Sequence, residues 1–258
     1  MRKLALALGV VFCCAIFSLA EEKKDEKKKE PPKVLMSVPL GIESGSSATI
    51  KTRGLHLENA GGVRFIDPKI PIDSRIKSKG KVEVPKTMEA SKVGDTQVEI
   101  ELTLPAETPA GPLQFVITTP DGDTPSHAIT VIEKGNLIEE KEPNGSFRKP
   151  QDVDLGKTIQ GQIGEPMDVD VFRFTAKSGQ MIVAEVKAAR LGSALDSTLT
   201  LYDESGRILA VNDDEETSVD SILRFRAPKD GRYLLTLIDA NDKGGPAHPY
   251  LLFLREEK

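Results

Sequence analysis

The sequence predicts an all-β protein, with two consecutive β-sandwich domains after a signal peptide. Apolar residues recur in short alternating runs such as Val98-Glu-Ile100-Glu-Leu102, which put every second side chain on one face of a pleated strand. Gly, Pro, Asn and Asp separate these runs, and Pro120-Asp-Gly122-Asp predicts a turn because Gly accepts a positive φ. No stretch longer than about ten residues keeps helical spacing. The 258 residues, less a signal of 20, leave 238, which is room for two ordinary domains.

The first 20 residues have the pattern of an export signal that is cleaved. Arg2 and Lys3 form a basic start, Leu4 to Leu19 is apolar, and Ser18-Leu19-Ala20 is a small-x-small cleavage site. A retained membrane anchor is the weaker alternative, because the apolar run is short for a span and has the flanks of a signal. We therefore expect residues 1–20 to be a signal peptide, and the protein to be secreted, periplasmic or part of the cell envelope.

Removal of the signal also limits the chemistry of the mature chain. Cys13 and Cys14 both lie inside it, which excludes disulfides, thiol catalysis and Cys-ligated zinc from the mature protein. The loss of Arg2 and Lys3 lowers the formal charge from −5 to −7. This acidic balance argues against nucleic acid as a partner, since its binding needs clustered Lys and Arg.

Residues 21–33 are predicted to be a charged spacer, and residues 34–133 the first sandwich. The spacer interleaves six Lys with five acidic residues, a mixture typical of a solvated segment. In the first sandwich we expect strands at 34–38, 48–52, 63–66, 82–84, 97–104, 113–118 and 127–132. The segment from Pro68 to Lys92 is longer and more polar than the rest, which leaves the middle of the sheet open.

The placement of Gly and Pro gives this first part a family resemblance. It rests on Pro39-Leu-Gly41, on Ala48-Thr-Ile-Lys-Thr-Arg-Gly54-Leu, and on Pro109-Ala-Gly111-Pro-Leu-Gln-Phe115-Val. Together these segments resemble an IPT/TIG domain over roughly Lys33 to Glu133. The resemblance implies an immunoglobulin-like fold for residues 34–133.

Residues 134–258 are predicted to form a second sandwich of jelly-roll type. The chain is polar from Lys134 to Glu140, and short runs then resume with turn signals between them. We expect strands at 158–163, 169–175, 181–188, 197–202, 208–212, 221–226, 232–238 and 250–254. Pairs on one face, such as Phe172 and Phe174, are interpreted as core.

Many motifs follow one another in a fixed order from Glu140 to Leu254. They are Glu142-Pro-Asn144, Gly161-Gln-Ile163, Asp168-Val-Asp170-Val-Phe172-Arg-Phe174, Gly179-Gln, Leu195-Asp196-Ser-Thr-Leu199-Thr-Leu201-Tyr-Asp203, Gly206-Arg-Ile-Leu-Ala210, Asn212-Asp213-Asp214, Asp230-Gly231-Arg-Tyr233 and Tyr250-Leu-Leu-Phe. This half resembles the bacterial pre-peptidase C-terminal domain, to which the collagen-binding domains of clostridial collagenases are related. The resemblance implies a non-catalytic β-sandwich attached to secreted proteins, often peptidases. Here no peptidase domain accompanies the module and the tyrosines of a collagen platform are missing, so we do not expect collagen binding.

The same resemblance implies a calcium site. In the collagen-binding relatives, calcium lies between the segment that enters the domain and an early strand. The matching ligands are Glu140, Glu142 and Asn144 on the entering segment, with Asp168 and Asp170 at the strand.

The residue types are consistent with that site. Carboxylates and an Asn carbonyl are the hard oxygen donors that Ca²⁺ prefers. Asp168 and Asp170 are two positions apart, so on a strand both side chains project to one side, and a divalent cation between them would relieve their repulsion. The alternative is a solvated acidic surface in which an Asp caps a turn.

No group of residues in the sequence supports an enzyme. His56, His127 and His248 do not occur in His-x-x-x-His or His-Glu-x-x-His spacing. There is no Gly-x-Ser-x-Gly elbow and no phosphate-cradling Gly-x-x-x-x-Gly-Lys. We therefore expect no catalytic residues and no organic cofactor.

These observations favour a secreted, non-catalytic, calcium-binding interaction or accessory module. Its expected partner is an extracellular or cell-envelope protein or polymer that the sequence does not identify. The alternative is a structural spacer of the cell envelope that has no specific ligand. A saturable response to calcium distinguishes the two.

Overall fold

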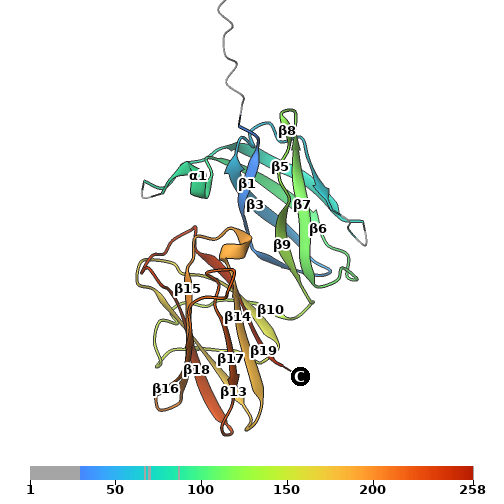
Figure 1. Ribbon diagram of the computed structural model, residues 1–258. Coiled ribbons are helices and arrows are strands. Elements are labelled where there is room, and N and C mark those ends of the chain that lie inside the picture. Colours follow the sequence, from blue (N-terminus) through green and yellow to red (C-terminus); the bar gives the residue numbers. More distant parts are fainter. Residues whose placement is uncertain (1–29, 67, 69–70, 87, 258) are drawn as a thin grey trace, which may run out of the picture. The chain divides into compact units, whose positions relative to one another are not determined.

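A computed structural model describes residues 30–66, 68, 71–86 and 88–257 of the chain (Figure 1). Nearly all of its ordered elements are β-strands, which confirms the all-β prediction and its β-sandwich architecture. The signal peptide predicted for residues 1–20, and most of the spacer predicted for 21–33, lie outside the described residues. Within the described part, no helix has the length and apolar character needed to cross a membrane.

The first sandwich consists of two sheets that enclose one apolar core. One sheet has the order β1 (Lys33–Val38), β3 (Ser47–Leu55), β6 (Thr96–Thr103), β5 (Asp73–Lys81), and the other has β2 (Gly41–Glu43), β9 (His127–Ile132), β7 (Gly111–Thr119), β4 (Gly62–Phe65), with β8 (Gly122–Asp123) beside β7. A short helix, α1 (Ala90–Val93), precedes β6. Alternating residues of facing strands, including Ile50, Ile100, Phe115 and Ile129, fill the space between the sheets.

One predicted strand of this sandwich is wrong, and the short strands β2 and β8 were not predicted. Residues 82–84 do not form the expected strand, and the strand lies earlier, at β5 (Asp73–Lys81). β5 pairs only with β6 and is an edge of its sheet. Its sequence Asp-Ser-Arg-Ile-Lys-Ser-Lys-Gly-Lys holds one apolar residue, Ile76, so apolar alternation could not reveal it. Lysines on an edge strand disfavour pairing with other chains.

The second sandwich contains all eight strands predicted for it, together with two short ones. One sheet has the order β11 (Gln151–Asp152), β13 (Val169–Ala176), β18 (Gly231–Asp239), β15 (Ser197–Asp203), β16 (Ile208–Asn212). The other has β10 (Leu137–Glu139), β12 (Lys157–Gln162), β19 (Pro249–Glu256), β14 (Met181–Lys187), β17 (Ile222–Arg226). Its core strands are antiparallel, whereas the short β10 and β11 join their sheets in parallel.

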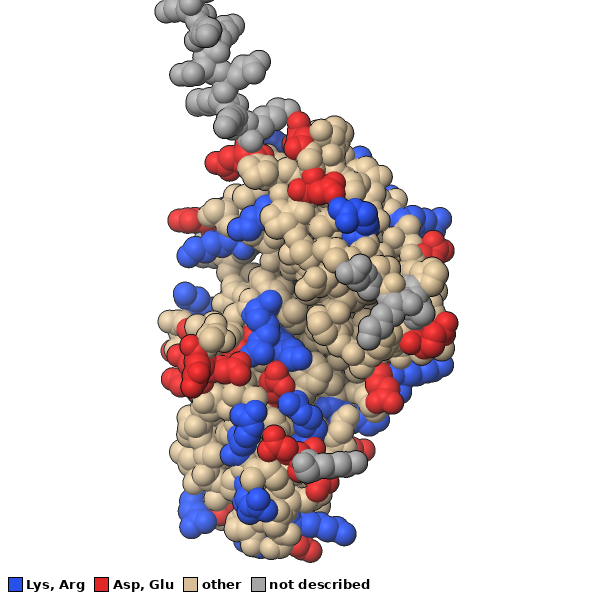
Figure 2. Space-filling model, turned by 45° about the vertical axis from the view of Figure 1, so that its right-hand side comes forward, with Lys and Arg blue, Asp and Glu red and all other residues tan. Residues whose placement is uncertain are grey.

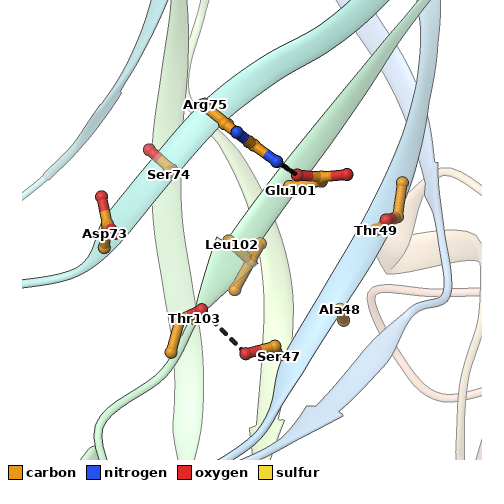
Figure 3. Close-up of a pocket in the computed structure, with 9 residues that line it drawn as sticks. All are labelled: Ser47, Ala48, Thr49, Asp73, Ser74, Arg75, Glu101, Leu102 and Thr103. Carbon is orange, nitrogen blue, oxygen red and sulfur yellow. Dashed lines mark hydrogen bonds and ion pairs between the residues drawn. The ribbon is translucent and has the colours of Figure 1, made fainter.

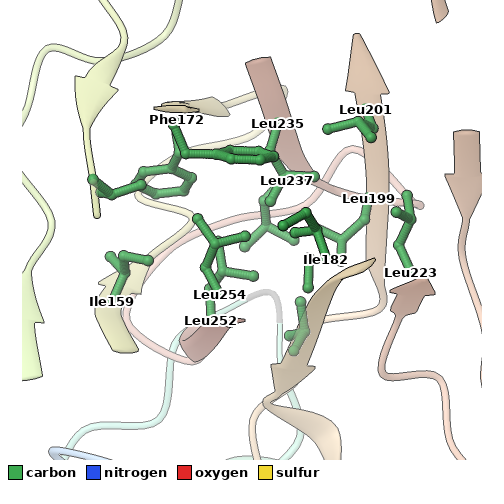
Figure 4. Packing of buried hydrophobic residues seen from close by; sticks show 14 of the residues in the cluster. Ile159, Phe172, Ile182, Leu199, Leu201, Leu223, Leu235, Leu237, Leu252 and Leu254 are labelled. Carbon is green, nitrogen blue, oxygen red and sulfur yellow. The ribbon is translucent and has the colours of Figure 1, made fainter. Parts of the chain in front are cut away.

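The core of the second sandwich follows from the alternation along its strands. Phe172 and Phe174 of β13 and Leu235 and Leu237 of β18 are all nearly inaccessible to solvent. Figure 4 shows Phe172, Leu235 and Leu237 together with Leu252, Leu254 and the labelled isoleucines of the opposite sheet. Each large apolar side chain buried in this way contributes about 1.5–3 kcal/mol relative to its exposed state.

A buried carboxylate fixes the turn after β14. Asp220 is fully buried, and its Oδ1 accepts the backbone N–H groups of Ala188 at 3.0 Å and Ala189 at 2.7 Å. Its Oδ2 accepts the backbone N–H of Arg190 at 3.2 Å and the Arg190 Nε–H at 2.7 Å. One side chain therefore accepts hydrogen bonds from an arginine and from three backbone donors at the 3-10 turn η1 (Ala189–Leu191).

We expect Asp220→Ala to lower the free energy of unfolding by about 3 kcal/mol or more. The substitution leaves three backbone donors and the Arg190 Nε–H without their acceptor, although the Arg190 guanidinium keeps its ion pair with Glu215. Asp220→Asn keeps one acceptor oxygen and should cost less. Urea unfolding measures both, with Glu216→Ala at an exposed position as the control. A loss in Asp220→Ala no larger than that of the control would contradict this role.

His127 is a half-buried titratable group of the first sandwich. It stands opposite Phe115 in the β7–β9 pair, and the two rings meet edge to face with 5.6 Å between their centroids. Its Nε2 has no hydrogen-bond partner among the described residues. Burial disfavours the imidazolium and lowers the pKa of His127 from 6.5 to about 4. The folded state therefore favours the neutral imidazole of His127 over the imidazolium.

We expect His127 to make the folded state sensitive to acid. The unfolded chain binds a proton there below pH about 6.5, the folded chain only below about 4, so stability falls as the pH drops through this window and then levels off. The loss between about pH 7 and about pH 5 amounts to about 2 kcal/mol. Urea unfolding at both values should show it in the wild type and much less in His127→Gln. Equal pH slopes in the two proteins would refute the assignment.

Candidate metal centre

The segment that enters the second sandwich runs beside β12 and carries the predicted ligands to its end. β10 pairs in parallel with β12, with Glu139 opposite Gln160. The backbone N–H of Glu140 continues this pairing by donating to the Gln160 carbonyl at 2.9 Å. The Gln162 N–H then donates to Glu140 Oε2 at 2.9 Å, which fixes the carboxylate beside the end of the strand.

Three of the predicted ligands come together at this end. One carboxylate oxygen from each of Glu140, Glu142 and Asp170 lies within 4.8 Å of the others. Asp170 is fully buried, Glu140 is half-buried and Glu142 is exposed, so the group extends from the core to the surface. Like charges at this separation repel one another, and a divalent cation would relieve that repulsion.

Asn144 joins the group through both its backbone and its side chain. Its backbone N–H donates to Glu142 Oε2 at 2.8 Å, and its Nδ2 donates to Glu140 Oε1 at 2.8 Å. The residue is only 1% exposed, yet its Oδ1 has no hydrogen-bond partner among the described residues. A buried amide oxygen without a partner is unusual, because desolvation of such a group costs about 1–3 kcal/mol.

Asp170 presents a second buried oxygen of the same kind. It lies on β13 on the same face as Phe172 and Phe174, so its side chain points into the sandwich. Its Oδ2 is 2.7 Å from the hydroxyl of Tyr250 on β19, whereas its Oδ1 is buried without a partner. The group thus contains two neighbouring orphan acceptors, one from Asn144 and one from Asp170.

The Tyr250 hydroxyl connects Asp170 to Glu140. It lies 3.0 Å from Glu140 Oε1 as well as 2.7 Å from Asp170 Oδ2, but it carries a single hydrogen. Both contacts are hydrogen bonds when the protonated Asp170 carboxyl donates to the tyrosine oxygen and the tyrosine hydroxyl donates to Glu140. Burial, followed by the hydrogen bond and charge of Glu140, raises the pKa of Asp170 to about 10, in agreement with that arrangement.

Gly161 is needed for this close approach. A Cβ at this position would lie 2.5 Å from the Tyr250 Oη and 2.6 Å from Glu140 Oε2. Any side chain there would push these oxygens apart. The glycine of the Gly161-Gln-Ile163 motif is therefore a structural requirement of the carboxylate group.

The structure does not bring Asp168 into the group. β13 begins at Val169, so Asp168 lies in the turn before the strand and the strand parity that would align it with Asp170 does not extend to it. Its Oδ2 accepts the Gly164 N–H at 2.7 Å, and its Oδ1 accepts the Val169 N–H at 2.9 Å. These bonds make it a turn cap, which is the alternative role for an Asp at a strand end.

Two residues of the site, Tyr250 and Gly161, were not predicted from the sequence to take part in it. Tyr250 and Gly161 both occur in the quoted motifs. Their residue types do not indicate contact with Glu140, which lies more than a hundred positions before Tyr250 and some twenty positions before Gly161 along the chain. The alternation along the strand could have indicated that Tyr250 points inward, because Tyr250, Leu252 and Leu254 share the inward face of β19. A tyrosine at the end of such a stripe needs a polar partner for its hydroxyl.

A separate hollow of about 530 Å³ lies on the outer face of the sheet formed by β3, β6 and β5 (Figure 3). An ion pair between Arg75 and Glu101 at 2.5 Å and a hydroxyl contact between Ser47 and Thr103 at 2.8 Å cross its floor. Its lining contains no histidine or cysteine. Arg75 and Glu101 already pair with each other, and none of the lining residues is a nucleophile with a base beside it.

Comparison with known proteins relates the second sandwich to a described family. Residues 168–238 match the family model of the bacterial pre-peptidase C-terminal domain. A probable subtilase-type serine protease of Deinococcus radiodurans is 39% identical over 118 residues, which cover 43% of this chain and 16% of that protease. This chain therefore spans less than a fifth of the length of that relative.

Two bacterial proteins of known structure are similar to part of this chain. The pre-peptidase C-terminal domain of a collagenase from Bacillus anthracis is 21% identical, with a TM-score of 0.36, over 45% of this chain and 100% of that domain. A periplasmic inhibitor of g-type lysozyme, PliG of Aeromonas hydrophila, is 16% identical, with a TM-score of 0.33, over 42% of this chain and 96% of that one.

The family match begins at Asp168, so it contains β13 to β18 with Asp170, and it leaves the entering segment with Glu140 outside. The IPT/TIG resemblance of residues 34–133 stays a prediction. Residues 168–238 of this chain are a bacterial pre-peptidase C-terminal domain, which is a non-catalytic module.

Proposed function

We propose that this protein is an exported, non-catalytic module that binds Ca²⁺ and serves as an interaction or accessory unit. The observation that carries the proposal is the pair of buried oxygens, Asn144 Oδ1 and Asp170 Oδ1, that have no partner beside the Glu140 and Glu142 carboxylates. Buried acceptors are otherwise almost always satisfied. A cation that accepts both oxygens and neutralises the neighbouring charges accounts for the arrangement.

The donor set favours calcium over other ions. All four residues offer oxygen only, whereas Zn²⁺ sites use nitrogen and sulfur ligands. Ca²⁺ takes 6–8 oxygens in flexible geometry, and Glu142 is exposed enough for water to complete the shell. The half-open position of the group supports an affinity typical of extracellular modules, with Kd of about 0.1–1 mM.

The contribution of the ion to stability is modest at this affinity. At about 1 mM free calcium, mass action adds about 0.4–1.4 kcal/mol to the free energy of unfolding. The main effect is local, because Glu140, Glu142 and Asn144 all belong to the segment that enters the sandwich. Calcium would order this segment against β13 and leave the core unchanged.

The accessory role is supported by the non-catalytic family and by the composition of the surface. The face in Figure 2 intersperses Lys and Arg with Asp and Glu, without an extended surface of one sign. We propose an extracellular or cell-envelope protein or polymer as the partner, with export through residues 1–20. A structural spacer without a ligand is the competing function, and calcium titration separates the two.

Isothermal titration of the protein with calcium is expected to give a saturable heat with about one site. Asp170→Asn and Glu140→Gln each remove a carboxylate from the group and should weaken binding at least about tenfold, because a ligand charge is lost. Asp168→Asn should change the affinity much less, since that carboxylate caps a turn. Asp214→Asn, at an exposed position, is the matched control.

Absence of a binding heat in the titration would contradict the calcium proposal and favour the structural spacer. An equal loss in Asp168→Asn and Asp170→Asn would show that the ligands are those of the sequence pattern and not those of the structural group. Circular dichroism of each variant establishes that it is folded before its heat is interpreted.

Calcium affinity is expected to rise with pH. At neutral pH the Asp170 carboxyl holds a proton, because burial raises its pKa to about 10, and this proton must leave before the oxygen can bind a cation. The affinity should therefore increase about tenfold per pH unit between about pH 6 and about pH 8. Titration in buffers of different ionisation enthalpy should report about one proton released. A heat that is independent of buffer and pH would contradict the protonated state.

A further inference from the structure

The site contains an Asn-Gly pair, Asn144-Gly145, which is prone to deamidation. The chain has five asparagines, and the other four precede Ala, Leu, Asp and Asp at positions 59, 136, 212 and 241. Asn followed by Gly is the pair most prone to deamidation, because glycine has no side chain to hinder attack by its backbone nitrogen and allows the required backbone rotation. The single pair of this kind lies among the proposed calcium ligands.

We propose that Asn144 is a deamidation site whose reaction is suppressed while the segment is closed over the carboxylate group, and that calcium controls the closure. In the reaction the Gly145 nitrogen bonds to Asn144 Cγ, and the Cγ–Nδ2 bond breaks. The amide nitrogen leaves as ammonia with the proton of the Gly145 N–H. Water then opens the cyclic imide to aspartate or isoaspartate. The inference rests on the proposed calcium function.

The closed conformation restrains each group that the reaction must move. Asn144 Nδ2 donates to Glu140 Oε1 at 2.8 Å, and the Asn144 backbone N–H donates to Glu142 Oε2 at 2.8 Å. The Asn144 carbonyl accepts the Ser146 N–H at 2.8 Å, which holds the peptide plane that leads into Gly145. With the side chain 1% exposed, Cγ cannot swing toward the Gly145 nitrogen until these contacts open.

The product no longer fits the closed site. Aspartate or isoaspartate at position 144 lacks the Nδ2 donor that binds Glu140, and it adds a further carboxylate to the group. Isoaspartate also places an extra methylene in the main chain before Gly145. A Cβ built on Gly145 would lie 3.3 Å from the Val169 carbonyl oxygen, so the space on this side of the segment is small. The reaction therefore leaves a permanent mark on molecules that have lost calcium.

Mass action gives the size of the effect. If calcium binds only the closed segment and the reaction needs the open one, the rate falls by the factor 1 + [Ca²⁺]/Kd. For a Kd of about 0.1–1 mM, protection is about two- to tenfold at about 1 mM calcium and increases with concentration. The calcium concentration of half protection should equal the Kd from calorimetry.

The experiment is incubation of the folded protein in calcium or in chelator, followed by trypsin digestion and mass spectrometry. Cleavage after Lys141 and Arg148 isolates the peptide from Glu142 to Arg148, whose amide-to-acid conversion is read directly. We expect slow conversion in calcium, faster conversion in chelator and no effect of calcium in urea-unfolded protein. Peptides containing Asn136 and Asn241 serve as internal controls. In Asp170→Asn the calcium dependence should disappear, and in the exposed variant Asp214→Asn it should remain.

The outcomes separate this inference from the function on which it rests. Absence of a calorimetric signal for calcium overturns the proposed function. A clear calcium heat together with equal or faster conversion in calcium overturns the inference alone, since closure then does not control the reaction.

Discussion

The position of one carboxyl group inside a core stripe is the constraint on which the second sandwich depends. Along β13 the alternation that buries Phe174 and Phe172 also turns Asp170 inward. An isolated charge there would be costly, so the end of the sandwich is built around it. Tyr250 reaches it from the opposite sheet, and the entering segment closes over it with Glu140 and Asn144.

A proton on Asp170 links the groups at this end of the second sandwich. The raised pKa of Asp170 and the single hydrogen of Tyr250 describe the same state, in which the buried acid is neutral and the tyrosine bonds Glu140. This arrangement still leaves two acceptor oxygens without partners. A hard divalent cation would satisfy both and replace the proton, which is why pH and calcium act on the same few atoms.

The described residues of this site are mainly oxygen donors from carboxylates and an amide. The oxygen donors converge on one another, and Arg75 and Glu101 in the hollow on the first sandwich form an ion pair. The family of residues 168–238 is non-catalytic, and the segment of a probable Deinococcus radiodurans protease that is similar to this chain covers 16% of that protease. An accessory role fits a module whose ligands lie at the point where the chain enters it. Asn144, as a ligand followed by glycine, makes the same entrance its most perishable part.

The sequence by itself determined the fold class, most strands and the identity of the donor residues. Alternation every second residue is a local signal, so the strands with apolar inward faces, such as β13 and β18, could be predicted, and edge strand β5 with its single Ile76 could not. Only the tertiary structure decided which donors meet. Asp168 shares the parity of Asp170 but precedes the strand and caps a turn, whereas Tyr250 and Gly161 enter the site through pairing across the two sheets. Contacts between segments so distant along the chain depend on register and closure, which no local pattern encodes.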